Sequence, residues 1–198
     1  MVAASLPAQN NRFIWQVGGG FTEPVGYSNQ RLERGFNVTA GAGVNLSSHV
    51  GLMGEVGFNR LGVANSLLTA AGIPAGSARI YSVTANPVVR FNPEGRADFY
   101  ITGGGGYYRR TVEFTEPSIA VVTAFDPFFG VFFPVAIPVD TVIGSFSQNK
   151  GGLNIGGGFS VRVKGDSNTK IFAETRYHYL YTSPSATSVM PITFGLRW

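Results

Sequence analysis

Apolar and polar residues alternate one by one along much of this chain. Between Phe36 and Leu46 every second residue is apolar, and the residues between them are Asn, Thr and Gly. The same alternation returns between Leu153 and Val163, with Gly157 in one of the apolar positions. Successive side chains of an extended chain point to opposite faces, so a period of two predicts β-strands with one apolar and one polar face.

Eight such segments follow one another along the sequence, and most are at least as long as the ~9–11 residues that a tilted strand needs to cross a bilayer. Their approximate bounds are 12–24, 34–46, 50–62, 78–92, 97–114, 147–164, 169–182 and 187–198.

The connections between these segments alternate in length. Short connections at 47–49, 92–96 and 165–168 have the Ser, Asn-Pro and Gly-Asp compositions of tight turns. The other connections, at about 25–33, 63–77, 115–146 and 183–186, are mostly longer. Outer-membrane barrels have short periplasmic turns and long outer loops. The pattern therefore predicts an all-β fold, an eight-stranded antiparallel up-and-down transmembrane β-barrel, with both termini periplasmic because the strand number is even.

Composition decides which face of the strands meets lipid. Charged residues make up 13% of the chain, about half of the ~25% that is usual in soluble domains. The polar faces carry mainly Gly, Asn, Thr and Ser, so they do not resemble the water-exposed face of a soluble barrel. Aromatic residues also gather near strand ends, as in the interfacial girdles of membrane barrels. We therefore expect the apolar face outside and the small polar residues inside.

The ends of the chain carry two further signals. The last strand alternates apolar residues up to a terminal aromatic (Ile192, Phe194, Leu196 and Trp198). This ending is similar to the C-terminal signal of outer-membrane proteins that the barrel assembly machinery reads. Residues 1–11 have no basic region and no full apolar core, so they are interpreted as an N-terminal tail or the remnant of a signal peptide. Residues 12–198 are interpreted as the barrel.

The eight-segment layout and the segments YITGGGGYYR, LNIGGGFSVRV and KIFAETRYHYLY resemble the small OmpA/OmpX-like outer-membrane barrel superfamily. The resemblance extends over the chain from about residue 12. It implies a location in the bacterial outer membrane and contact with lipid and lipopolysaccharide, and it says little about activity.

Single charges stand on the predicted inner face. Glu174, Arg176 and His178 alternate, so all three point the same way. One interpretation is a proton-sensitive gate or small polar site, because His titrates near neutral pH. The other is a buried ion network that fills the interior, because buried charges need partners. The residues predicted for this lumen network are Glu55, Arg90, Arg162, Glu174, Arg176, His178 and Arg197.

The sequence gives little support for a catalytic site or a cofactor site. An outer-membrane acylase or acyltransferase needs a Ser, a His base and a carboxylate within reach. His49 lies in a short turn beside Ser47 and Ser48, and His178 has Glu174 nearby without a Ser in phase. The glycine runs have neither a P-loop pattern nor a following helix. We therefore expect no enzyme activity, no cofactor or metal site, and no nucleic-acid partner.

The outer loop at 115–146 differs from an ordinary surface loop. It is rich in Phe, Val and Ile and almost free of charge, with a turn composition at 126–130. It can extend the flanking strands as a hairpin, fold inward as a plug, or pack on the barrel rim. Large exposed apolar patches mark interaction sites, so a hairpin that docks on a protein partner, a second copy or a surface polymer is favoured. The predicted loop patch is Phe125, Phe128, Phe129, Phe132 and Phe133.

These observations leave three functional hypotheses. The first is a structural or interaction protein that anchors outer loops in the membrane. The second is a small pore for ions or solutes, which requires a water path past the inner charges. The third, an enzyme acting on outer-leaflet lipid, would depend on His178.

Overall fold

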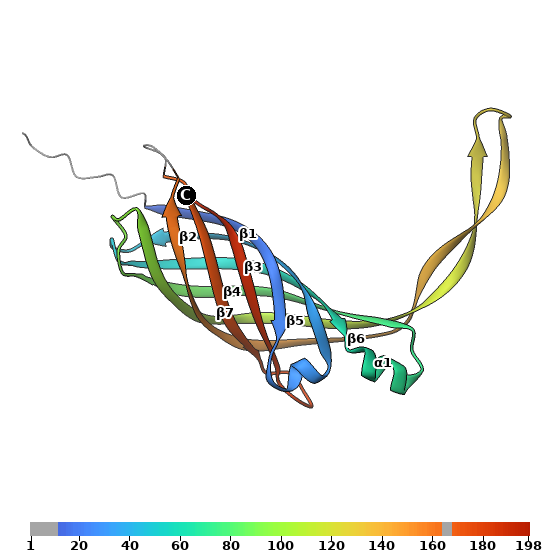
Figure 1. The fold of residues 1–198 in the computed structure, drawn as a ribbon, viewed down its shortest axis with the longest axis horizontal. Coiled ribbons are helices and arrows are strands. Elements are labelled where there is room, and N and C mark those ends of the chain that lie inside the picture. The colour runs from blue at the N-terminus through green and yellow to red at the C-terminus, as the bar shows by residue number, and fades with distance from the viewer. Residues whose placement is uncertain (1–11, 164–167) are drawn as a thin grey trace, which may run out of the picture.

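The computed structural model describes residues 12–163 and 168–198. The predicted N-terminal tail, 1–11, lies outside the described residues. Eight strands form one closed antiparallel barrel in which each strand pairs with its neighbours in the sequence and β8 pairs with β1 (Figure 1). The strands are β1 (Phe13–Pro24), β2 (Leu32–Asn45), β3 (Val50–Val63), β4 (Ala75–Arg90), β5 (Ala97–Asp126), β6 (Val131–Arg162), β7 (Lys170–Leu180) and β8 (Thr187–Arg197).

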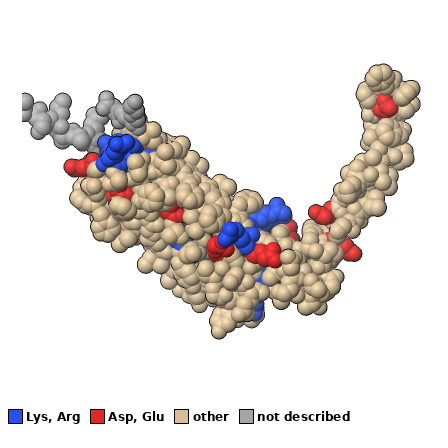
Figure 2. Space-filling view, in the orientation of Figure 1, with Lys and Arg blue, Asp and Glu red and all other residues tan. Residues whose placement is uncertain are grey.

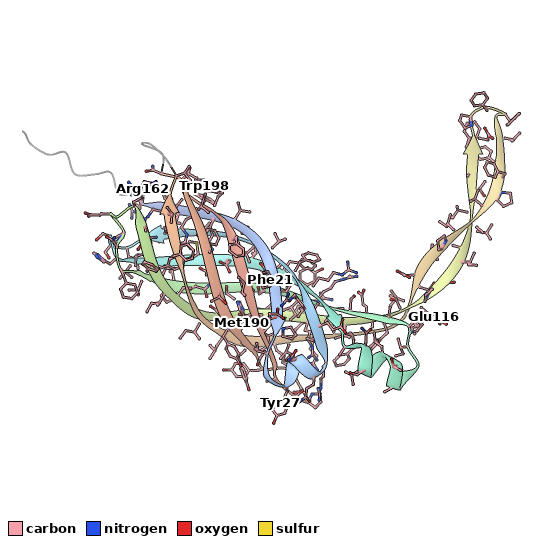
Figure 3. The ribbon with its side chains drawn as sticks, in the orientation of Figure 1. Phe21, Tyr27, Glu116, Arg162, Met190 and Trp198 are labelled. Carbon is pink, nitrogen blue, oxygen red and sulfur yellow. The ribbon has the colours of Figure 1, made fainter. Side chains whose placement is uncertain are left out.

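The observed strands confirm the predicted fold. β1 begins and β8 ends at the same end of the barrel, where backbone hydrogen bonds join Trp15 to Trp198 at 2.9 and 3.0 Å. We call this the terminal end, and the opposite one the loop end. Arg162 and Trp198 lie at the terminal end and Tyr27 at the loop end (Figure 3). Closure matters because a closed barrel leaves no strand of the ring with unpaired backbone groups.

The loop end carries two short helices and one long hairpin. The 3-10 helix η1 (Gly26–Gln30) joins β1 to β2, and α1 (Asn65–Ala71) lies between β3 and β4. Neither is long and apolar enough to cross a membrane, nor is any other helix among the described residues. β5 and β6 have 30 and 32 residues, far more than a bilayer crossing needs, and their outer parts project away from the barrel (Figure 1).

The alternation of the sequence becomes the inside and outside of the barrel. Large apolar side chains such as Val38, Val56 and Val83 are exposed on the outer surface, while Asn37, Glu55 and Thr84 are buried inside. Two ion pairs join outward-facing charges near the loop end: Arg34 with Glu23, and Arg79 with Glu113 at 2.7 Å. The outer wall is therefore apolar between its ends, as a lipid-facing surface must be.

Candidate functional site

A bidentate ion pair lies in the middle of the barrel. Arg176 on β7 donates from Nη1 and Nη2 to the two carboxylate oxygens of Glu55 on β3, both at 3.0 Å. Its Nε lies 2.5 Å from Oε1 of Glu174, two residues earlier on the same strand. All three side chains are at least nine-tenths buried. One guanidinium thus serves two carboxylates, which is the forked geometry that makes arginine suitable for buried pairs.

Two further side chains close this arrangement into a ring. Arg197 on β8 lies 3.8 Å from Glu174 and donates to Oε1 of Gln16 on β1 at 2.7 and 3.1 Å. Gln16 in turn donates to Glu55 at 2.6 Å. We call the five side chains of Gln16, Glu55, Glu174, Arg176 and Arg197 the charge ring. Its two carboxylates balance its two guanidinium groups, so it buries no net charge.

The remaining residues of the predicted network lie elsewhere. His178 is buried on the loop-end side, where Nδ1 lies 2.9 Å from the hydroxyl of Tyr108. Arg90 is half-buried near the terminal end and does not belong to the ring. Arg162 is exposed at the terminal rim (Figure 3). The predicted network therefore included residues that do not belong to the charge ring. The alternation places a residue on the inner face of its strand, but it does not specify how far along the barrel axis the residue lies.

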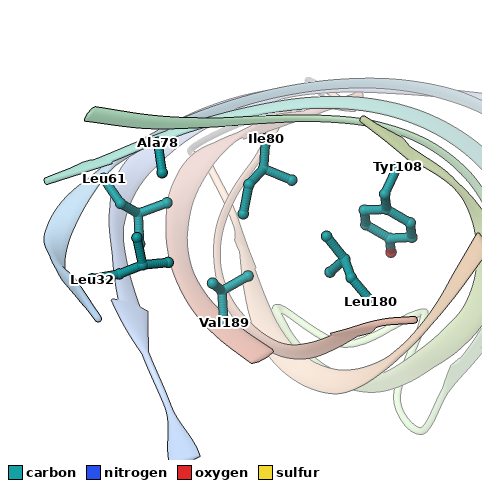
Figure 4. Packing of buried hydrophobic residues seen from close by; sticks show 7 residues of the cluster. All are labelled: Leu32, Leu61, Ala78, Ile80, Tyr108, Leu180 and Val189. Atoms are coloured by element: carbon teal, nitrogen blue, oxygen red, sulfur yellow. The ribbon is translucent and has the colours of Figure 1, made fainter. Parts of the chain in front are cut away.

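Apolar side chains close the interior on both sides of the charge ring. On the loop-end side a cluster includes Leu61, Ile80, Leu180 and Val189, and its side chains meet across the inside of the barrel (Figure 4). On the terminal side Ile14, Met53, Val88 and Tyr100 form a second cluster. The cavity beside the ring measures about 10 Å³, which is at the lower limit of what can hold a single water molecule. The interior is a packed core, as expected for eight strands.

Sequence reasoning missed several interior residues. Gln16 was overlooked because it is uncharged, although it stands between Ile14 and Gly18 on the inner face of its strand. Asp98, which is 1% exposed, and Lys170 form a second pair at 3.9 Å near the terminal end. Tyr100 lies under Arg197, with its ring centroid 4.3 Å from the guanidinium carbon. The signal available in the sequence was a polar or tyrosine side chain in phase with the inner face of its strand.

Outside the barrel, residues 115–146 form a twisted two-stranded hairpin. β4 last pairs with β5 at Thr115, and β7 first pairs with β6 at Gly152. Beyond these points the two arms pair only with each other, up to a turn in which Gly130 has a φ of 64°. Asp126 caps that turn by accepting from the backbone N–H of Phe128 at 2.8 Å. The inward plug is therefore not what the structure shows.

The predicted loop patch occupies the tip of this hairpin. Phe128 and Phe129 in the turn are 94% and 80% exposed. Phe125 and Phe132 face each other across the arms with ring centroids 5.0 Å apart, and Phe133 follows them. In the space-filling view the hairpin shows acidic groups and no basic ones (Figure 2). Its charges are Glu116, Asp126 and Asp140.

The predicted C-terminal signal lies along the seam that closes the barrel. Phe194, Leu196 and Trp198 are exposed on the outer face and Ile192 is partly exposed. Ile192 pairs with Phe21 of β1, Phe194 with Gly19 and Leu196 with Val17. The motif's apolar residues thus face outward on the strand that completes the ring.

The described residues contain no group of three or more His, Asp or Glu side chains that could hold a metal ion. His49 lies 2.9 Å from the Ser48 hydroxyl in an exposed turn. His178 has a tyrosine as its partner.

Comparison with known proteins gives a family. The sequence pattern of the family described as "Outer membrane protein beta-barrel domain" matches residues 1–197. A search of curated proteins finds no significant match.

Solved structures of small outer-membrane barrels share the fold. Neisserial surface protein A superposes with a TM-score of 0.59 at 16% identity, covering 93% of this chain and 95% of that one. A major outer membrane protein from Thermus thermophilus gives a TM-score of 0.57 at 11% identity, with coverages of 94% and 97%. The attachment invasion locus protein Ail of Yersinia pestis, solved in complex with the heparin analogue sucrose octasulfate, gives 0.51 at 20% identity, with coverages of 94% and 99%.

Proposed function

The chain belongs to the outer membrane protein beta-barrel domain family, and from this premise we propose that it is a non-enzymatic surface protein whose hairpin 115–146 docks on a partner outside the cell. The bacterial outer membrane is the location of this family. In the proposed orientation both termini are periplasmic and the hairpin projects outward, because short turns join the strands at the terminal end and long connections join them at the other.

The observation that carries the proposal is the exposure of the hairpin's apolar residues. Ile119, Val121 and Phe132 are each at least 70% exposed, on arms that have no other pairing partner among the described residues. Leaving such residues in water has no benefit for the barrel, since the hairpin covers none of its wall. Large exposed apolar surfaces usually mark interaction sites.

The two edges of the hairpin differ in their capacity to accept another strand. Pro117, Pro134 and Pro138 pair with Asp140, Thr123 and Ile119. Proline has no N–H to donate, so these are non-hydrogen-bonded pairs of the antiparallel ladder. In such pairs the backbone N–H and C=O groups of both residues point away from the partner strand. On the β6 edge Pro134 and Pro138 therefore remove outward donors. On the β5 edge the outward N–H groups of Ile119, Val121, Thr123 and Phe125 form an uninterrupted row.

An open, apolar strand edge is a template for strand addition. The partner that fits is an extended apolar segment with Lys or Arg at its flanks, because the hairpin carries three acidic residues and no basic one. A second copy fits less well. In the antiparallel register that pairs residues 116–126 of two copies completely, Glu116 of one copy faces Asp126 of the other, and like charges directly opposite are destabilising.

The test uses two proline substitutions at directly opposite positions. Val121 pairs with Ala136, and both have outward N–H groups, so Val121→Pro and Ala136→Pro disturb the hairpin alike but only the first interrupts the β5 edge. A synthetic peptide of about eight alternating Val and Thr residues flanked by Lys is titrated into the purified full chain, and amide hydrogen exchange is followed.

We expect the peptide to slow exchange at Ile119, Val121, Thr123 and Phe125 in the wild type and in Ala136→Pro, and not in Val121→Pro. Cross-linking in intact outer membranes then compares the same variants with one lacking residues 117–145. Equal behaviour of the two proline variants contradicts docking through the β5 edge. Captured species that persist without the hairpin contradict docking through the hairpin as a whole.

The packed interior supports this anchoring role over the alternative of a small pore. Two apolar clusters and the charge ring fill the path along the barrel axis, with a cavity of only about 10 Å³ beside the ring. Water or ion passage would require these layers to move.

A further inference from the structure

A second feature of the loop end is a pocket in the barrel mouth with a volume of about 180 Å³. η1, α1 and the 183–186 connection surround it together with the ends of the strands. Its apolar wall includes Leu32, Val63, Leu67, Val112 and Phe114. The pocket is separate from the edges of the hairpin, and its proposed role does not depend on theirs.

Two arginines line the pocket without a carboxylate beside them. Arg31 donates to the Ser185 hydroxyl at 2.8 Å, and Arg110 donates from Nη1 to the Thr187 hydroxyl at 2.6 Å. No Asp or Glu is among the residues that line the pocket. The nearest acids in sequence are occupied elsewhere: Glu33 accepts from the backbone N–H of Asn65, and Glu113 pairs with Arg79.

The arrangement leaves positive charge unsatisfied. Two guanidinium groups of like charge line the same pocket. The Nε of Arg110 is buried and has no hydrogen-bond partner among the described residues. Arg110 is partly buried, and a buried charge without a counter-charge is costly. Guanidinium donors match the oxygens of carboxylate, sulfate or phosphate.

We propose that the mouth pocket binds a small amphiphilic oxyanion, with its charged group on Arg31 and Arg110 and its apolar body against the wall that includes Leu32 and Phe114. The polar floor supports this orientation. The Thr187 hydroxyl that accepts from Arg110 also lies 2.7 Å from the Thr182 hydroxyl, which lies 2.9 Å from the carbonyl oxygen of Ser185. This chain of bonds holds the arginine toward the pocket.

The experiment measures binding by calorimetry on the full chain in a non-ionic detergent. The probes are phenyl phosphate, inorganic phosphate and benzyl alcohol, which offer both parts of the proposed ligand, the anion alone and the apolar body alone. The variants are Arg31→Gln and Arg110→Gln. Arg109→Gln is the matched control, because Arg109 is adjacent on the same strand and exposed on the outer face.

We expect phenyl phosphate to bind, and each pocket variant to weaken it at least about tenfold, the loss of one charge-assisted contact. Arg109→Gln should bind as the wild type does. Absence of phenyl phosphate binding, or equal weakening by Arg109→Gln, overturns the proposal. Benzyl alcohol binding as tightly as phenyl phosphate overturns the role of the arginines, and inorganic phosphate binding as tightly overturns the role of the apolar wall.

The same titration in nanodiscs distinguishes two sources of the ligand. If discs of anionic phospholipid suppress phenyl phosphate binding while discs of zwitterionic phospholipid do not, a lipid headgroup occupies the pocket. If binding is equal in both, the ligand is a soluble oxyanion. Either result supports the proposed chemistry. Because Arg31 and Arg110 lie outside residues 117–145, the variant lacking the hairpin should retain this binding.

Discussion

The barrel and the hairpin share the same alternation of apolar and polar residues, but they differ in backbone pairing and in what surrounds their apolar side chains. In the barrel every strand has two neighbours, so its backbone groups are paired on both sides and its apolar residues face outward into lipid. In the hairpin each arm has one neighbour, so backbone groups and apolar side chains are left to water. β5 and β6 belong to both regions, which shows that alternation specifies a strand while closure specifies where that strand is stable.

The sharpest test of this comparison is a steric one inside the barrel wall. A Cβ at Gly156 would collide with the carbonyl oxygen of Thr175 and with the side chain of Arg176. Gly156→Val should therefore prevent the wall from closing, at a cost of about 4 kcal/mol or more. Heat-modifiable gel mobility after refolding into lipid vesicles measures the folded fraction.

Gly151→Val is the matched control on the same strand. A Cβ there meets only one atom within 4 Å, the carbonyl oxygen of Gly106. It should fold as the wild type does. Equal folding of the two variants would show that the wall tolerates the added side chain and that close packing is not required.

The next effect in size concerns the charge ring. Arg176→Met leaves Glu55 and Glu174 buried near each other without the guanidinium that pairs with both. Breaking a buried pair in this way typically costs about 3–5 kcal/mol. Unfolding by guanidinium chloride in lipid vesicles measures the change in the free energy of unfolding.

Arg109→Met, on the outer face, is the comparison variant and should change stability by less than about 0.5 kcal/mol. If both arginine variants unfold at the same denaturant concentration, the ring is not a stabilising element of the barrel.

The smallest effect is expected from the hairpin. Deleting residues 117–145 and joining the arms by a short Gly-containing turn removes no barrel contact, since β4 and β7 pair only with the inner parts of β5 and β6. The free energy of unfolding of the barrel should stay within about 0.5 kcal/mol of the wild type. A large loss in the same unfolding measurement would mean that the hairpin is part of the barrel's own fold.

The candidate site was predictable only in part, for reasons that particular residues show. Glu55, Glu174, Arg176 and Arg197 were recognisable because charge on an inner face is rare. Gln16 was not, although it lies between Glu55 and Arg197. Its bond to Arg197 joins residues 181 positions apart, and only the β1–β8 register brings them together. Arg162 is the opposite case. Its position in the alternation is that of an inner-face residue, but it lies at the rim of the barrel and not at the level of the charge ring.

By itself, the sequence determined that the chain forms strands, how many there are, which face is apolar and that the ring can close in lipid, because a period of two and the spacing of turns are local properties. Only the tertiary structure decided which inner side chains meet, because pairing depends on register and height. It also decided that Arg31 and Arg110 share a pocket and that the prolines interrupt one hairpin edge and leave the other open. These are facts about neighbours across strands, and distance along the chain does not specify them.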